Sequence, residues 1–179
     1  GKLNKAIKDF DKTTELDSLY ANGYLLKALS HHDLKHYDVA LMNYNKALKI
    51  NPDLIAAYND RGRLWIQYKK YDQAISDFSH ALSIDKNFHL ALMNRGIAYI
   101  LVNDWDHAID DFSKYLEIEP KNAIAHYYRG SAYMQKRLWK KAISDFNVAL
   151  KINPGYQVAI DKRKIAIRNF RKENKKQQN

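Results

Sequence analysis

The sequence contains no cysteine, only three prolines and six glycines, and no long run of apolar residues. Without cysteine the chain has neither disulfides nor thiolate-bound metal sites, and the composition suits a reducing compartment, so we expect a cytoplasmic protein. No stretch reaches the roughly 18 apolar residues that a membrane-spanning helix requires. Glycine-rich phosphate loops and nucleophile motifs are also missing, so we expect no catalytic residues and no cofactor.

The most informative feature that is present is a period. The motif Ala-x-x-x-Phe recurs every 34 residues, with tyrosine replacing phenylalanine once. Its copies begin at Ala6, Ala40, Ala74, Ala108 and Ala142. A fixed period of this length indicates repeated helical units, each of which buries its apolar face only against its neighbours.

Residues 55–88 show the pattern of one unit most clearly. Apolar residues spaced three and four apart predict two amphipathic helices, separated by a break at residues 69–72. A short break between two helices makes an antiparallel pair, so we predict an all-α fold. Gly62 lies in the middle of the first helix, where glycine costs about 1 kcal/mol relative to alanine. Because Gly96 and Gly130 repeat this cost, we expect a close approach of the paired helix there, against the alanines of the repeated motif.

The first helices carry a second signature, for example Leu92-x-x-Arg95-Gly96-x-x-Tyr99. Together with Ala-x-x-x-Phe and a following proline, it resembles the tetratricopeptide repeat (TPR) family. The resemblance covers residues 1 to about 156. It implies a right-handed superhelical solenoid of antiparallel helix pairs, which binds peptides or helices of partner proteins on its concave face. The chain departs from the family pattern in placing a cation where leucine is usual.

The period divides the chain into seven segments. They are the second helix of an incomplete repeat (1–20), four complete repeats (21–54, 55–88, 89–122 and 123–156), a capping helix (157–173) and a polar tail (174–179). We expect the tail to be frayed, because it lacks apolar groups. Lys164 occupies the glycine position of the last helix and would obstruct a paired helix, which is why we expect a cap. Since the first repeat has only one helix, we expect a fragment of a longer chain, with self-association through the open N-terminal end as an alternative role.

The cations in the leucine position have candidate partners. Aspartates recur at the same period, and we predict that Arg95 and Arg129 form structural ion pairs with an aspartate of the same or of the preceding repeat. The sequence leaves the choice between these two repeats open.

We expect the first helices to line a partner-binding concave groove. Their inward residues, projected from the helical phase, are Asn59, Asp60, Arg63, Met93, Asn94, Ile97, Tyr127, Tyr128, Ser131 and Lys162. Tyrosine is favoured at binding hot spots, whereas the apolar members could equally belong to the core between repeats. The implied function is a non-catalytic interaction scaffold that holds a protein or peptide partner.

Chaperone-binding TPR domains resemble one another in a clamp of lysine, arginine and asparagine for a terminal carboxylate. The corresponding positions here hold Leu25, Leu29, Asp60, Leu90 and Asn94 or, one repeat later, Asn59, Arg63, Asn94, Ile124 and Tyr128. The decisive cations are missing, which argues against a chaperone tail as the partner.

The net charge of +10 is unevenly distributed, because residues 89–122 are acidic and residues 123–179 strongly basic. Contact with a polyanion, either nucleic acid or an anionic membrane, through this basic end is a further alternative. The periodic aromatics belong to the core and do not form a base-stacking platform, which argues against nucleic acid. The apolar face of the capping helix is used in docking, which argues against a membrane. His31, His32 and His36 cluster near a turn, where we favour a structural role over metal binding.

Overall fold

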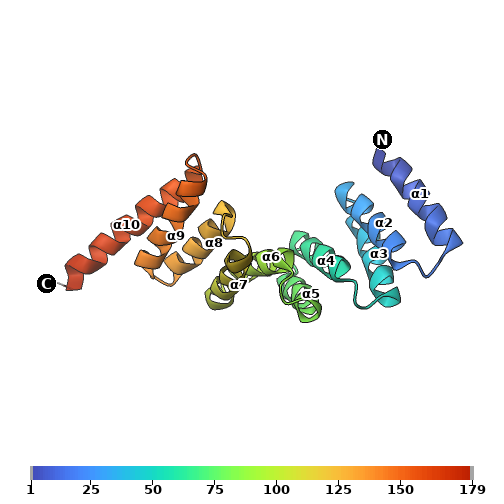
Figure 1. The fold of residues 1–179 in the computed structure, drawn as a ribbon, viewed down its shortest axis with the longest axis horizontal. Coiled ribbons are helices and arrows are strands. Elements are labelled where there is room, and N and C mark those ends of the chain that lie inside the picture. The colour runs from blue at the N-terminus through green and yellow to red at the C-terminus, as the bar shows by residue number, and fades with distance from the viewer. Residues whose placement is uncertain (1, 178–179) are drawn as a thin grey trace. The chain divides into compact units, whose positions relative to one another are not determined.

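The computed structural model describes residues 2–177, and this part of the chain contains ten α-helices (Figure 1). They are α1 (Lys2–Leu16), α2 (Ala21–Asp33), α3 (Tyr37–Ile50), α4 (Ile55–Gln67), α5 (Tyr71–Ile84), α6 (His89–Leu101), α7 (Trp105–Ile118), α8 (Ala123–Gln135), α9 (Trp139–Ile152) and α10 (Gln157–Gln177). Consecutive helices pack as antiparallel pairs, such as α2 with α3, α4 with α5 and α8 with α9. The predicted all-α fold is confirmed.

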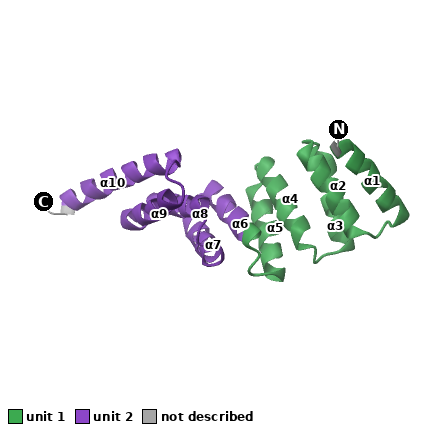
Figure 2. Ribbon diagram, turned by 45° about the horizontal axis from the view of Figure 1, so that its top comes forward, with its two compact units in different colours: residues 1–91 green, residues 92–179 purple. Residues whose placement is uncertain are grey.

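The helices form two compact units, Gly1–Ala91 and Leu92–Asn179 (Figure 2). The division falls within α6. The core of the first unit gathers Leu25, Tyr44, Leu48 and Leu64 with small alanines. In the second unit, Phe112 and Phe146 are each completely buried at the centre of a helix pair.

The mid-helix glycines are explained by the phenylalanines of the repeated motif. A Cβ atom at Gly62 would lie 2.6 Å from the Phe78 ring, and one at Gly130 would lie 2.9 Å from the Phe146 ring. These distances are too short for any side chain, so the predicted close approach is confirmed. The expectation that alanine forms the opposing surface was wrong, because the aromatic ring itself fills the space that glycine leaves.

The turn between the two helices of a repeat has a conserved backbone shape within this chain. Lys35, Lys69, Asn103 and Arg137 all adopt a left-handed conformation, with φ between 57° and 61°. They stand 34 residues apart, directly before the residue that precedes each second helix. A single left-handed residue reverses the chain in little space, so the two helices can pack closely.

The last helix differs from its predicted extent. α10 continues to Gln177, four residues beyond the predicted end at 173, so residues 174–177 are helical rather than frayed. Lysine and glutamine are good helix formers, and Lys175 and Lys176 complement the negative end of the helix dipole. Residues 178 and 179 of the predicted tail lie outside the described residues. Within the described part of the chain, no helix combines the length and the apolar character needed to cross a bilayer.

Candidate functional site

The repeated cations form ion pairs inside their own repeat. The pairs are Arg61–Asp77, Arg95–Asp111 and Arg129–Asp145. In each pair the arginine Nε donates to Oδ2 of the aspartate at 2.8 Å, and Nη2 donates to Oδ1 at 2.6–2.8 Å. Of the two alternatives left open by the sequence, the same-repeat pairing is therefore correct. Such a two-pronged bond is geometrically specific and holds the second helix in register with the first.

Arg61 and Arg129 also reach back to the preceding repeat. Arg61 Nη1 donates to Asn45 Oδ1 at 2.7 Å, and Arg129 Nη1 donates to Ser113 Oγ at 3.2 Å. One guanidinium thus joins the second helices of two successive repeats. Because the aspartates are buried and their acceptor atoms are engaged, these pairs belong to the framework and not to a ligand site.

In the first unit, the predicted site residues form a small polar cluster on α4. Asn59 is buried, with 4% of its surface exposed, and its side-chain amide donates to Asp60 Oδ1 at 3.2 Å. Arg63 donates to the same oxygen at 3.1 Å and keeps 54% of its side chain exposed. Burial raises the pKa of Asp60 above its usual range, against the opposing effect of Arg63. The structure brings these three predicted residues together.

Two residues of this cluster were missed by the sequence analysis. His32 Nδ1 lies 3.3 Å from the hydroxyl of the fully buried Tyr44. The charges of Asp60 and Arg63 act on the pKa of both groups. Burial, and then the positive charge of Arg63, lower the pKa of His32. The signal was available, because Tyr44 is the one copy of the repeated motif that carries a hydroxyl and therefore needs a polar partner.

The predicted residues of α6 belong largely to the core of the second unit. Met93 and Ile97 pack, half-buried, against the cluster of Ala108, Phe112 and Ala132. Asn94 lies between them in the sequence and is half-buried as well. Met93 and Ile97 therefore contact the core, as one of the two alternatives expects, and their part in a ligand contact stays a prediction.

The tyrosines of α8 form an aromatic cluster. The Tyr128 ring stacks on Phe112, with centroids 5.6 Å apart and planes 9° apart, and Tyr127 lies 5.4 Å from Tyr128. Tyr156 joins them at 5.2 Å from Tyr127. Burial raises the pKa of Tyr128 and of Tyr156, so these phenols stay protonated. We define the tyrosine cluster as Tyr127, Tyr128 and Tyr156. Sequence reasoning missed Tyr156 because it precedes α10 in a turn.

The hydroxyl groups of the tyrosine cluster have no hydrogen-bond partner among the described residues, although Tyr127 and Tyr128 are half-buried. They are not closed off from solvent either, because the one fully enclosed side-chain polar atom without a partner in residues 2–177 is Arg163 Nε. Each ring is thus held by its neighbours while its hydroxyl is free to donate or accept. Ser131 is a poorer candidate, because its hydroxyl already donates to the Tyr127 carbonyl at 2.8 Å. Lys162 forms no ion pair with any described residue.

The three clustered histidines do not face one common point. His31 and His36 approach each other, with their Nδ1 atoms 3.4 Å apart, whereas His32 faces Tyr44. Across residues 2–177 no group of three metal-ligating side chains comes together. The arrangement therefore offers hydrogen bonding and aromatic contact as its chemistry.

Comparison with known families agrees with this architecture. Models of the tetratricopeptide repeat match residues 21–54, 55–88, 89–122 and 123–156. The chain belongs to the tetratricopeptide repeat family. The resemblance inferred from the sequence is confirmed. Proteins with TPR repeats bind peptide or protein partners, and the fold is typically non-catalytic.

Solved structures share the TPR fold over most of their length. YrrB, described as a TPR protein with an unusual peptide-binding site, is 24% identical with a TM-score of 0.80, over 91% of this chain and 84% of that chain. MamA is 22% identical with a TM-score of 0.80, over 86% and 90%. MamA from residue 41 onward, from Desulfovibrio magneticus RS-1, is 17% identical with a TM-score of 0.79, over 87% and 88%. At these identities the likeness concerns the fold alone. A search of curated protein sequences finds no match.

Proposed function

We propose that this TPR chain is a non-catalytic scaffold that holds a peptide or a helix of a partner protein on the exposed faces of its first helices. The observation that carries the proposal is the tyrosine cluster of the second unit. Its rings are fixed by packing, and its hydroxyls have no partner among residues 2–177. Rigid aromatic groups with a free polar end contribute strongly to protein recognition, because little side-chain entropy is lost on binding.

The chemistry of the cluster suits a peptide backbone. A tyrosine hydroxyl donates to a carbonyl and accepts from an amide, and the ring edges contact apolar side chains. Lys162, without an ion pair in the described residues, would add attraction for an acidic group. The YrrB structure shows that this fold supports peptide binding in another protein, which is consistent with the proposal.

A second contact area is proposed in the first unit, at Asn59, Asp60 and Arg63. Arg63 is the exposed member, and the half-buried Asp60 accepts a hydrogen bond from its guanidinium, which orients that group. An anchored arginine of this kind binds a carbonyl or carboxylate with less loss of freedom than a mobile one. We expect it to add to binding through polar contacts, whereas the tyrosine cluster provides most of the affinity.

The test begins with peptides selected from a random display library on the wild-type protein. Their affinity for Tyr127→Phe/Tyr128→Phe is then measured by fluorescence anisotropy. This variant keeps the packing and removes only the hydroxyls, and we expect binding to weaken about tenfold, the value of one or two hydrogen bonds. Arg63→Ala should weaken it by a smaller factor.

Tyr71→Phe, at the start of α5, is the matched control and should bind as the wild type does. Selected peptides that bind the double variant undiminished would contradict the proposal. If, in addition, the molecular mass of the protein rises with its concentration, the self-assembly role would be favoured instead.

A further inference from the structure

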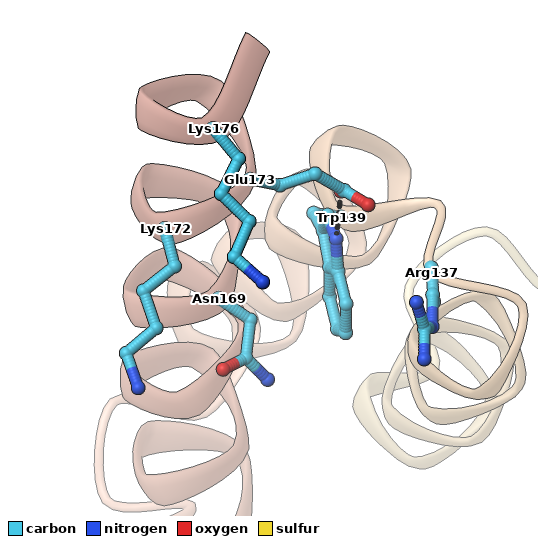
Figure 3. Close-up of a pocket in the computed structure, with 6 residues that line it drawn as sticks. All are labelled: Arg137, Trp139, Asn169, Lys172, Glu173 and Lys176. Carbon is cyan, nitrogen blue, oxygen red and sulfur yellow. Dashed lines mark hydrogen bonds between the residues drawn. The ribbon is translucent and has the colours of Figure 1, made fainter. Parts of the chain in front are cut away.

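Two clefts flank a single hydrogen bond at the basic end of the second unit. Trp139 Nε1, at the start of α9, donates to Glu173 Oε2 of α10 at 2.5 Å. A cleft of about 370 Å³ lies on one side, lined by Arg137, Trp139, Asn169, Lys172, Glu173 and Lys176 (Figure 3). The other side has a cleft of about 400 Å³, to which Lys140, Lys141 and Phe170 contribute. We call this pair of clefts the Trp139 clefts.

The Trp139 clefts carry a marked excess of positive charge. Their cations are Arg137, Lys140, Lys141, Lys172 and Lys176, all exposed. None of them forms an ion pair with a described residue. The one carboxylate in the lining, Glu173, already accepts the indole N–H and lies between Trp139 and α10 in Figure 3. The clefts thus collect cations without the anions that would balance them.

Earlier repeats show that this charge is a specific departure from the pattern. The residue after the first aromatic of the second helix is Asp38 in α3, Asp72 in α5 and Asp106 in α7, but Lys140 in α9. Asp38 accepts from the Tyr68 hydroxyl, and Asp106 pairs with Lys136. In both cases the donor is the residue that directly follows the first helix of the next repeat, α4 for Tyr68 and α8 for Lys136.

At α9 the equivalent residue, Lys140, carries the opposite charge, and the donor that pairs with Asp38 and with Asp106 has no counterpart there. The position of Tyr68 and Lys136 is taken by Phe170, and the Lys140 ammonium lies over its ring, 5.6 Å from the centroid. Lysine in the first turn of a helix is unfavourable, because the helix dipole is positive there. An anion supplied from outside would remove this cost.

We propose that the Trp139 clefts bind an acidic peptide segment of a partner protein, with one carboxylate on each side of Trp139. Each cleft has the size of a few side chains, and each offers at least two cations. The site lies apart from the tyrosine cluster and does not depend on it.

The aromatic groups of the clefts favour a protein over a nucleic acid. Trp139 and Phe170 are the aromatic residues of the cleft lining, and the Lys140 ammonium lies over one face of the Phe170 ring. Single-stranded nucleic acid is bound by stacking successive bases on several aromatic rings, whereas Trp139 is the one ring of this lining without a cation over it. A membrane surface would need a continuous exposed apolar face beside the cations, whereas Leu138 is the one exposed large apolar residue of the cleft lining, and Val158 and Ile165 of α10 lie outside it.

The experiment measures binding of a fluorescein-labelled peptide of alternating glutamate and serine to the full chain. One variant, Lys140→Asp/Lys141→Gln, copies the residues found at Asp72 and Gln73. A second, Lys172→Gln/Lys176→Gln, alters only exposed positions of α10 and should leave the fold intact. We expect both to bind about tenfold more weakly than the wild type. Lys49→Gln/Lys86→Gln removes the same charge as the second variant from exposed sites in the first unit, and it should change binding less than about twofold.

Two further measurements separate the outcomes. In a Trp65→Phe/Trp105→Phe background, Trp139 is the remaining tryptophan, and its fluorescence should change on addition of the peptide. Oligothymidylate and vesicles of phosphatidylcholine with phosphatidylserine are tested beside the peptide. Absence of peptide binding, equal loss in the control variant, or tighter cleft-dependent binding of either competitor would each overturn the proposal.

Discussion

Asp111 and Asp145 occupy the same place in successive repeats of the second unit, yet the pKa values of their carboxyls shift in opposite directions. Both are buried, with 1% and 5% of their surface exposed, and both accept two hydrogen bonds from an arginine. Burial raises the pKa of Asp111, and the charge and bonds of Arg95 do not compensate fully. Burial acts on Asp145 in the same direction, but the bonds from Arg129 and His126 outweigh it and lower the pKa.

The difference comes from one residue. His126 Nδ1 lies 3.0 Å from Asp145 Oδ1, and its Nε2 lies 3.1 Å from the Pro120 carbonyl. At the equivalent place in the preceding repeat stands Leu92, which is almost fully buried and offers no donor. The comparison shows that the direction in which the pKa of a buried carboxyl shifts depends on how many donors reach it, and not on its burial alone.

Breaking the ion pairs should have the largest effect. Arg95→Met leaves the buried Asp111 without its arginine, and we expect a loss of about 3 kcal/mol in the free energy of unfolding. Arg129→Met should cost less, because His126 still reaches Asp145. Urea denaturation followed by circular dichroism measures both. Adding Asp111→Leu to Arg95→Met should recover part of the loss, since an apolar pair leaves no uncompensated charge. An equal cost for the two arginine variants would refute the role given to His126.

Making the two repeats alike is the next test. His126→Leu copies Leu92 into the fourth repeat, and we expect it to destabilise the protein by about 1.5 kcal/mol through loss of a bond to a charged group. The pKa of Asp145 should then rise above its wild-type value, because one of the bonds that oppose burial is removed. Burial raises the pKa of Asp111 in the same way. Carboxyl chemical shifts during an NMR pH titration report this directly. An unchanged pKa would show that Arg129 alone is sufficient.

The smallest expected effect is on the pH dependence of stability, which should differ in sign between the two carboxyls. Asp145 has a lowered pKa, so its contribution is present above the unfolded value of about 3.9 and is lost as the pH falls through the folded value. Asp111 has a raised pKa, so its contribution is larger at low pH and declines as the pH rises through its folded value.

Melting temperatures test this difference in sign. They are measured for the wild type, Asp111→Asn and Asp145→Asn between pH 6 and pH 3, in steps of about one pH unit. The difference between the wild type and Asp145→Asn should shrink below about pH 3.9. The difference between the wild type and Asp111→Asn should move in favour of the wild type as the pH falls toward that value. Parallel curves for the two variants would contradict the comparison.

Much of the fold could be predicted because the same helical pattern occurs five times at a constant spacing. The glycine positions predicted the close approach that Phe78, Phe112 and Phe146 now explain. The candidate site was less predictable. Helical phase placed Tyr127 and Tyr128 among the inward residues of the expected groove, but it could not show that Tyr156 joins them from a turn or that Met93 and Ile97 pack against the core.

The sequence by itself determined the family, the helix pairs and the unusual basic end of the chain, because a period of 34 residues and a run of charges are properties of the linear order. Only the tertiary structure decided which aspartate each arginine holds, that His126 lies against Asp145, and that Trp139 divides two cation-lined clefts. These are distances between side chains on different helices. They depend on how each helix pair packs, which a repeated pattern constrains but does not specify.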